Sequence, residues 1–522
     1  MRGLVILCLL LVIPISYQKS TPESDSYVAA VVEFKLTRNS SQALKEYVHY
    51  IRKAAEKDAD VVVFPEMTLV RKSEFVRVPI HGLLREHPVP ALSPNLYDEP
   101  LVAISKAARD NQIYVVINVQ EQMDCSVYCP GEYCPEKKTY HFNTNVVFDR
   151  TGAVLDRYRK INLFGEATRY PALEPDFGLF HTDFGVTFGH FICFDLMFQV
   201  PAIQLVQKYN LTDVIFPTMW FSEMPFLTAV QIQEAYAYIM NVNFIAANAN
   251  NVLVGTAGSG IYSGRAGALV SIMPGVPATR LLVERVPKIP GRLSGTYPGP
   301  LFDKPSDTDD LLLNKDISLA SRVSKELVPG FQEFTLTEKD VSCKFTVRIK
   351  QTSQAHKYRA FIQDSSNTYA KRQVGVASCS VVACRYEDVV SCPYRFSPQD
   401  AKLEFEELQI EMTTYSHRHN STLDCDNIVY FPVSLRINKF PLDSRNFTYT
   451  ELNQDGVNTL DKSGREKIIY KINAPQNDLI SFGVWGRIYD KDVSGPTEVT
   501  EEDRSNYIHI ENIIYKVSES RH

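Results

Sequence analysis

Three reactive side chains in the first half of the chain each follow a run of residues that is typical of a β-strand. Glu66 follows "DVVVFP", Lys160 follows "AVLDRYR" and Cys193 follows "GVTFGHFI". In layered α/β domains, ligands bind at the carboxyl ends of the strands. We therefore expect these three side chains to converge on one site.

A cysteine, a glutamate and a lysine at one site have the chemistry to hydrolyse an amide. The Cys193 thiol attacks as a thiolate and needs a base or a nearby cation, and Glu66 can take its proton. Lys160 can hold the oxyanion that develops on the attacked carbonyl, with the backbone N–H of Phe194 as a second donor. After an amine has left, Glu66 can activate water against the thioester, and Glu166 can support the geometry of Glu66 and Lys160.

Each of these residues also has a purely structural interpretation. A carboxylate after "FP" commonly caps a helix or lies in solvent, and a lone cysteine in an apolar run is commonly a small buried hydrophobe. Two other hydrolase classes lack support, because the sequence has no G-x-S-x-G elbow and no H-E-x-x-H motif. The cysteine mechanism therefore depends on the local sequences around all three residues.

Residues 27–288 must position these side chains, and their pattern alternates between strands and helices. The segments "YVAAVVEFKL" and "DVVVFPE" are predicted strands, and "SQALKEYVHYIRKAAEKDA" between them is a predicted helix with an apolar stripe. Similar segments follow as far as "NFIAANAN", and a hairpin turn is expected at residues 150–152. This alternation predicts a layered α/β domain whose sheets are buried on both faces.

The pattern changes twice after residue 288. Residues 289–330 are rich in proline, glycine and aspartate, which predicts a linker or a long excursion. Residues 331–522 contain short runs close to strict alternation and few helix signals. They predict a second, mostly β domain that is stapled by disulfides.

The N-terminus predicts a secreted protein. Residues 1–16 combine Arg2, an apolar run and Ser16, so they are predicted to be a signal peptide. No other segment is apolar enough to cross a membrane, and the polar C-terminus lacks the tail of a lipid-anchor signal. The net charge is −6 and no basic stretch occurs, so nucleic acid is not expected as a partner. We expect a soluble extracellular glycoprotein, with glycosylation sequons at Asn39, Asn210, Asn420 and Asn446.

The ten cysteines fit an oxidising compartment. Cys8 leaves with the signal peptide and Cys193 stands alone, so eight cysteines remain and could form four disulfides. They form two odd clusters, namely Cys125, Cys129 and Cys134, and Cys343, Cys379, Cys384, Cys392 and Cys425. Full pairing needs one bridge between the clusters, and otherwise each keeps a free thiol. A zinc site at residues 125–134 is disfavoured, because no histidine is interleaved at finger spacing.

Three segments together resemble a known superfamily. The segments "VVVFPE", "YRKINLF" and "GHFICFD" resemble, in this order, the signature segments of the nitrilase superfamily of carbon-nitrogen hydrolases. The resemblance covers residues 27–288 and implies a four-layer αββα sandwich, here followed by the smaller β domain at 331–522. It also implies that Glu66 is the proton acceptor, Lys160 the oxyanion or proton donor, and Cys193 the nucleophile.

A closer resemblance is to the branch of vanins and biotinidases. The segments "FICFDLMFQVPAIQLV", "GSGIYS" and "FGVWGRIYDKD" look like that branch. The resemblance implies a secreted amidase that acts on a small linear amide without a cofactor or a metal. Pantetheine, split into pantothenate and cysteamine, is the leading substrate.

Two alternatives to a pantetheinase stay open. The spacing in "KINLFGE" resembles biotinidases, which implies hydrolysis of biocytin-like amides. A non-catalytic binding glycoprotein on the same fold is the third hypothesis. Four residues close to predicted strand ends are candidates for substrate contacts: Asn118, Phe194, Trp220 and Phe221.

Overall fold

The computed structural model describes residues 19–493, apart from residues 38, 70–73, 79–82, 129–133, 175, 354–355 and 453–464. The predicted signal peptide and Cys129 therefore lie outside the described residues. Within the described part, no helix has both the length and the apolar content that a membrane crossing requires.

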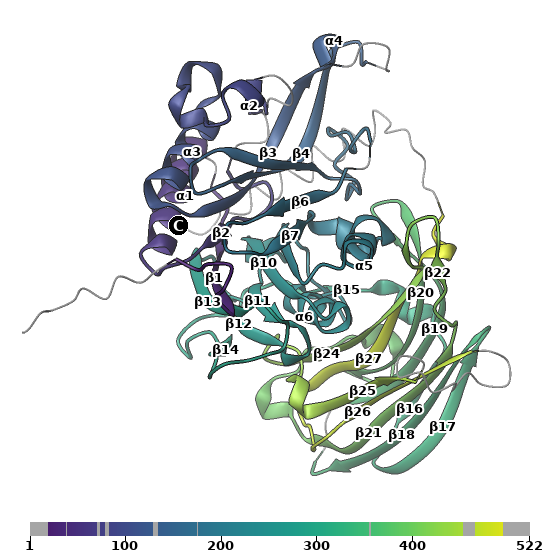
Figure 1. The fold of residues 1–522 in the computed structure, drawn as a ribbon. Helices are drawn as coiled ribbons and strands as arrows, with labels where there is room; N and C mark the ends of the chain where they lie inside the picture. Colours follow the sequence, from purple (N-terminus) through teal and green to yellow (C-terminus); the bar gives the residue numbers. More distant parts are fainter. Residues whose placement is uncertain are drawn as a thin grey trace, which may run out of the picture.

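Two β-sheets form the centre of the first region (Figure 1). The first sheet contains, in spatial order, β13 (Arg280–Pro287), β1 (Ser26–Lys35), β2 (Val61–Val63), β3 (Tyr114–Asp124), β4 (Thr139–Phe148) and β5 (Val154–Arg159). The second contains β14 (Gly299–Leu301), β12 (Ala268–Ile272), β11 (Ser259–Ser263), β10 (Asn243–Asn250), β8 (Asp213–Thr218), β7 (Thr187–His190) and β6 (Gly178–His181). Strands β1 and β10 join the two sheets by a short parallel pairing, in which Phe34 lies opposite Ala249.

Strand β1 shows how the sheets pack, because its side chains alternate between two cores. Tyr27, Ala29 and Val31 belong to a cluster that includes Phe188 of β7 and Ile215 of β8, so this cluster lies between the sheets. The intervening side chains of β1 pack instead against helices α1 (Ser40–Ala55) and α3 (Glu99–Asn111). Helix α1 begins at the Asn39 cap, whose side chain accepts the Gln42 N–H at 3.0 Å.

Helices α5 (Gln204–Tyr209) and α6 (Ala229–Met240) cover the outer face of the second sheet. Helix α6 starts with a capping box between Thr228 and Gln231. Most of its first two turns is buried, because a further region of the chain covers the side that faces away from the sheet. The order helix, sheet, sheet, helix confirms the αββα sandwich that the sequence resemblance implied.

The C-terminal region is a sandwich of two antiparallel sheets (Figure 1). One sheet contains β16 (Ser324–Leu327), β19 (Lys357–Tyr369), β20 (Arg372–Cys384), β27 (Leu479–Ile488) and β24 (Ile428–Arg436). The other contains β17 (Gly330–Glu338), β18 (Val341–Gln351), β21 (Leu403–Thr414), β26 (Glu466–Ile472) and β25 (Phe447–Glu451). This arrangement confirms the prediction of a mostly β region.

The disulfides lie within each cysteine cluster. Cys125 pairs with Cys134, Cys343 with Cys379, and Cys384 with Cys392. The bond from Cys343 on β18 to Cys379 on β20 links the two sheets of the C-terminal sandwich. Among the described cysteines, Cys193 and Cys425 are free and buried, so Cys425 takes no part in the bridge between clusters that full pairing would need.

The two regions share one hydrophobic core. Trp485 on β27 and Phe431 on β24 belong to the same buried cluster as Tyr236 on α6 and Ile203 before α5. The connecting residues are also held in place, because β15 (Asn314–Lys315) pairs with β9 (Glu223–Met224). The C-terminal region is therefore packed onto the outer helix layer of the first region.

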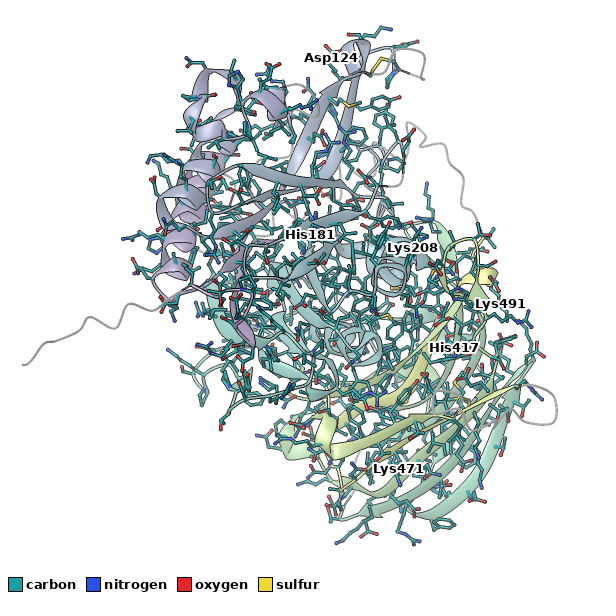
Figure 2. The ribbon with its side chains drawn as sticks, viewed as in Figure 1. Asp124, His181, Lys208, His417, Lys471 and Lys491 are labelled. Carbon is teal, nitrogen blue, oxygen red and sulfur yellow. A yellow bond between two sulfur atoms is a disulfide. The ribbon has the colours of Figure 1, made fainter. Side chains whose placement is uncertain are left out.

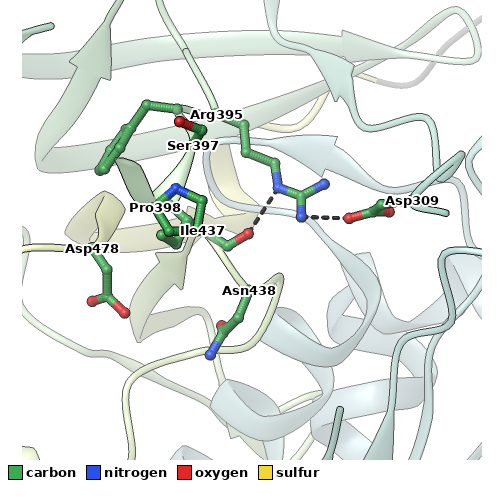
Figure 3. Close-up of a pocket in the computed structure, with 8 residues that line it drawn as sticks. Asp309, Arg395, Ser397, Pro398, Ile437, Asn438 and Asp478 are labelled. Carbon is green, nitrogen blue, oxygen red and sulfur yellow. Dashed lines mark hydrogen bonds and ion pairs between the residues drawn. The ribbon is translucent and has the colours of Figure 1, made fainter. Parts of the chain in front are cut away.

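Polar contacts also hold the connecting segment at Asp303 and Asp309, which precede β15. Arg395 donates to Asp309 Oδ2 at 2.5 Å and to the Ile437 carbonyl at 2.8 Å, beside a pocket that Pro398, Asn438 and other residues line (Figure 3). The buried Lys439 ammonium contacts Asp303 at 2.8 Å and Asp309 at 3.1 Å.

The buried carboxyl of Glu33 should make stability depend on pH. Burial raises the pKa of Glu33 from 4.5 to about 7, although hydrogen bonds from Asn250, Ser259 and the Gly258 N–H oppose the rise. The folded state then binds more protons than the unfolded state between these two pKa values, so the free energy of unfolding falls as pH rises through them. The fall amounts to at most about 3 kcal/mol.

We expect the Glu33→Gln variant to lose this part of the pH dependence. Thermal unfolding midpoints of the variant, recorded from pH 4.5 to pH 7.5, should change less than those of the parent protein. Glu406→Gln, which changes an exposed glutamate of β21, is the matched control. Identical pH profiles for Glu33→Gln and the parent would contradict the prediction.

Candidate active site

The structure brings the predicted triad together at the ends of three strands. Glu66 follows β2, Lys160 directly follows β5, and Cys193 begins a 3₁₀ turn (Cys193–Met197) that follows β7. All three residues are buried, with exposed fractions of 3%, 1% and 6% respectively. Lys160 Nζ lies 2.8 Å from Glu66 Oε1, and the charges of both residues act on the Cys193 thiol.

The buried ammonium of Lys160 lies between two carboxylates. Its Nζ donates to Glu66 Oε1 and to Glu166 Oε1, each at 2.8 Å. Burial alone would lower the pKa of Lys160, but the charges of Glu166 and Glu66 outweigh it and raise the pKa well above its usual value. Lys160 is therefore a permanent cation in this site.

Backbone and amide donors orient the two carboxylates. Asn143 Nδ2 donates to Glu66 Oε1 at 2.7 Å and to Glu166 Oε1 at 2.9 Å. The second oxygen of Glu66 accepts the Met219 N–H at 2.8 Å, and that of Glu166 accepts the Phe164 N–H at 2.6 Å. Each carboxylate is thus held at both oxygens, which leaves it little freedom to rotate.

The backbone at Cys193 adopts an uncommon conformation. Its φ is +46°, in the left-handed region that residues other than glycine seldom occupy. Such conformations cost about 1–3 kcal/mol and persist where the surroundings impose them. The conformation lets the chain turn sharply at the end of β7, so that the side chain of Cys193 faces the ends of the neighbouring strands.

Asp195 holds this turn in place. Its Oδ1 accepts the Asn162 N–H at 2.8 Å and Asn162 Nδ2 at 3.0 Å. Its Oδ2 accepts the Tyr158 hydroxyl at 2.7 Å and the Ile192 N–H at 3.1 Å. Burial raises the pKa of Asp195 to about 6, while Lys160 and the Tyr158 hydrogen bond oppose the rise. Above that pH the carboxylate accepts from all four donors and ties the Cys193 turn to the loop after Lys160.

The surroundings of the Cys193 thiol favour its protonated form. Burial raises its pKa, the charge of Glu66 raises it further, and Lys160, the Thr218 hydroxyl and the Met219 N–H oppose the rise only in part. A thiol of this kind becomes nucleophilic only when a base takes its proton during attack. Glu66 is the carboxylate whose charge acts on this thiol, and its role as the base stays a prediction.

The structure places the predicted substrate residues in different settings. The Asn118 amide is buried and supports the network, because it donates to Asn143 Oδ1 at 2.8 Å and accepts the Met67 N–H at 2.9 Å. Trp220 lies in the core, and its indole N–H donates to the Leu227 carbonyl at 2.8 Å. A role in contacting substrate stays a prediction for both residues.

Phe194 and Phe221 belong to an aromatic group beside the turn. Both rings contact Phe164, with ring centroids 4.9 Å apart for Phe194 and 6.1 Å apart for Phe221. Phe164 is the exposed member, at 36%. These three residues, which we call the aromatic rim, offer an apolar surface next to Cys193, and sequence reasoning had not singled out Phe164.

Sequence reasoning also missed two residues that complete the site. Asn143 lies within the strand-forming run "HFNTNVVF", where an amide among buried apolar residues is a signal of a polar function. Asp195 follows Cys193 by two residues in the same apolar run and is fully buried. A buried carboxylate so close to the nucleophile is the signal that could have found it.

Within the part of the chain that the structure describes, one group of side chains that could ligate a metal lies away from this site. His417, labelled in Figure 2, lies in the C-terminal region with Glu451 and Glu466, and their donor atoms are within 4.8 Å of one another. His417 Nδ1 is 2.6 Å from Glu466 Oε2. Two ligands of one tetrahedral ion, bound at roughly 2.1 Å each, lie farther apart than this. The short distance indicates a hydrogen-bonded ion pair.

Comparisons with known proteins cover both regions. Residues 28–266 match the carbon-nitrogen hydrolase family, and residues 314–492 match the vanin C-terminal domain. Vanin-like protein 1 of Drosophila melanogaster is 32% identical across 96% of this chain and 92% of its own. A pantetheinase of Sus scrofa is 26% identical across 85% of this chain and 82% of its own. A biotinidase of Homo sapiens is 33% identical across 52% of this chain and 54% of its own.

One solved structure aligns with part of the chain. An amidase from Nesterenkonia sp. aligns with 51% of this chain and 92% of its own, with 17% sequence identity and a TM-score of 0.38.

The buried charge array should control stability. Lys160→Met removes the cation and leaves Glu66 and Glu166 facing each other, so we expect the free energy of unfolding to fall by about 3–5 kcal/mol. The double variant Lys160→Met/Glu166→Gln removes one of the two like charges and should recover part of this loss. Denaturation midpoints of the parent and both variants measure the effect. If Lys160→Met were as stable as the parent, the two carboxylates would not destabilise the protein when the cation is removed, and the prediction would be wrong.

Proposed function

The chain belongs to the vanin-like family of carbon-nitrogen hydrolases, and from this premise we propose that Glu66, Lys160 and Cys193 hydrolyse a small linear amide through a thioester on Cys193. Family membership makes the protein a hydrolase of carbon–nitrogen bonds other than peptide bonds. The observation that carries the proposal is the buried Glu66–Lys160 pair beside a free cysteine in a left-handed turn.

Acylation joins the Cys193 sulfur to the amide carbonyl carbon. Glu66 takes the thiol proton as the sulfur attacks, and the carbonyl oxygen becomes an oxyanion. The Lys160 ammonium and the backbone N–H of Phe194 stabilise that charge. The carbon–nitrogen bond then breaks, and Glu66 returns the proton to the departing amine, which leaves as a neutral molecule.

The second half of the reaction is hydrolysis of the thioester, and it uses the same groups. Glu66 takes a proton from a water molecule, whose oxygen attacks the thioester carbon, and Lys160 again faces the oxyanion. The carbon–sulfur bond breaks, and the sulfur regains its proton from Glu66 while the carboxylic acid leaves. Glu166 and Asn143 hold Lys160 and Glu66 in position during both halves.

Pantetheine is the proposed substrate. A relative named pantetheinase aligns over most of both chains, and the aromatic rim gives a slender amide an apolar surface beside Cys193. Biocytin-like amides are the second candidate, because human biotinidase is the more identical of the two over the part that it covers. The spacing of six residues from Lys160 to Glu166 also resembles biotinidases.

We further propose that the protein is secreted and glycosylated. The apolar segment at residues 1–16 has the features of a signal peptide. Asn39, Asn210 and Asn446 are exposed, which is compatible with attached glycans. Asn420 is half-buried and is the least accessible of the four sequons.

Amine release by the purified protein tests the catalytic proposal. We expect the parent to release amine from pantetheine or biocytin, and Cys193→Ala and Glu66→Gln to lose more than about 1000-fold of the turnover. Glu406→Gln, with an exposed carboxylate, is the control for the glutamate change. Full activity of Cys193→Ala would exclude the thioester route. Release from pantetheine alone would assign the substrate, and release from biocytin alone would assign the alternative.

Secretion has its own test. The protein expressed in insect or mammalian cells should appear in the medium, begin after residue 16, and lose mass on treatment with peptide N-glycosidase. N-terminal sequencing and intact mass measurement give both results. A protein that stays in the cells with residues 1–16 attached would contradict this proposal.

A further inference from the structure

A hydrogen-bonded path leads from the C-terminal region to the nucleophile. Arg372, at the start of β20, donates from Nη1 to Asn162 Oδ1 at 2.9 Å, across 210 residues of sequence. Asn162 follows Lys160 by two residues and donates twice to Asp195 Oδ1, at 2.8 Å from its backbone and 3.0 Å from its side chain. Asp195 in turn lies two residues after Cys193. Two contacts therefore connect an arginine of the second region with the candidate nucleophile's own turn.

The guanidinium sets the direction of the Asn162 amide. A guanidinium has donors and no acceptor, so it can face only the oxygen end of that amide. With Oδ1 turned toward Arg372, Nδ2 points the other way and donates to Asp195 Oδ1 and to the Val200 carbonyl, the latter at 2.9 Å. These two acceptors and the Arg372 donor favour the same orientation of the amide from opposite sides, so Arg372 adds a contact that fixes the position of Asn162.

Arg372 is itself held at a constrained hairpin. The turn between β19 and β20 consists of Ala370 and Lys371, whose φ angles of +46° and +67° are both left-handed although neither residue is glycine. Ala370 lies close to Gly165, where an added Cβ would sit 3.6 Å from the alanine Cβ. The hairpin tip thus abuts the loop that carries Lys160 and Glu166.

The Arg372 side chain also packs on the end of the nucleophile's turn. Its guanidinium carbon lies 4.1 Å from the centroid of the Phe198 ring, and Phe198 directly follows the turn Cys193–Met197. A guanidinium stacked on an aromatic ring has a fixed plane as well as a fixed position. The same side chain therefore contacts both the loop of Asn162 and the end of the turn.

A second arginine, Arg487, binds the same turn. Arg487 on β27 is fully buried and donates from Nε to the Met197 carbonyl at 2.9 Å, at the last residue of the turn. Its other nitrogens donate to the Gly375 carbonyl and to Asp492, which lies 2.7 Å away. Because β20 and β27 are neighbours in one sheet, two arginines of that sheet contact the C-terminal end of the turn.

We propose that Arg372 is a positioning residue of the amidase site, which holds the Cys193 turn in its reactive geometry through Asn162 and Asp195. This inference rests on the proposed role of Cys193 as the nucleophile. It gives the C-terminal region a part in the reaction, although none of its residues belongs to the triad. Small displacements of a reacting atom cost large factors in rate, so the effect should exceed what a surface contact contributes.

The first test replaces Arg372 with methionine, which keeps an unbranched side chain over Phe198 and removes the donors. We expect kcat to fall roughly 10- to 100-fold with KM little changed. We also expect slower alkylation of Cys193 by iodoacetamide, followed by peptide mass. Arg372→Lys, which restores a charged donor, should recover part of both losses. The control Arg385→Met changes an exposed arginine of the same region and should match the parent.

The second test asks whether Arg372 acts through Asn162. In an Asn162→Ala background, the further change Arg372→Met should cost little, because the path is already broken. The proposal would be overturned if Arg372→Met lowered kcat by the same factor in both backgrounds. It would also be overturned if Arg372→Met left kcat and the rate of Cys193 alkylation unchanged. If Arg372→Met does not fold, Arg372→Lys takes its place in both backgrounds, and it should lower kcat where Asn162 is present but not further where residue 162 is alanine.

The alkylation rate separates this proposal from the amidase proposal. If the parent protein releases no amine from either amide, the proposed function fails, yet Cys193 can still be alkylated. Slower alkylation in Arg372→Met than in Arg385→Met would then still support the positioning role. Equal rates would overturn it regardless of the substrate.

Discussion

The burial of one cation, the ammonium of Lys160, is the constraint on which the rest of the site depends. An ammonium removed from water loses several kcal/mol of hydration and needs matched partners to be tolerated. Glu66 and Glu166 supply two charges, each at 2.8 Å, but two carboxylates around one ammonium leave a net negative charge. The Asn143 amide and the N–H groups of Met219 and Phe164 offset that excess. Each of these donors comes from a different segment, so the array can form only when the sheets are in register.

The negative surroundings also explain the behaviour of the thiol. A site with excess negative charge disfavours a resting thiolate, which is why burial and Glu66 together raise the pKa of Cys193. A raised pKa lowers the fraction of thiolate, and the rate at which a thiol is oxidised or exchanges with disulfides falls with that fraction.

Much of this architecture could be predicted from the sequence, and the rest could not for identifiable reasons. The alternation of strands and helices and the three signature segments led to the αββα fold and to the family. Glu66, Lys160 and Glu166 do meet, because strand ends at one edge of a sheet are neighbours by topology. The apolar run around Asn143 signals a polar function there, but its partners Glu66 and Glu166 come from other segments and could not be identified from that run. Arg372 was out of reach altogether, since it meets Asn162 only through packing between regions. Trp220 is a different case, because a tryptophan near a strand end suggests a binding surface, while the structure shows that its indole N–H is satisfied by the Leu227 carbonyl; its contact with substrate stays a prediction.

The depth at which the reactive atoms lie has a consequence for what can reach them. Glu66, Lys160 and Cys193 are almost wholly covered, while Phe164 stands at the surface with Phe221 stacked beside it. With exposed fractions of at most 6%, the triad presents little surface to a peptide bond that is flanked by bulk on both sides. An amide near the end of a thin, flexible chain meets less of this obstruction. The burial of the three side chains therefore favours thin acyl donors over thick ones, a selection by shape that is separate from the chemistry of the site.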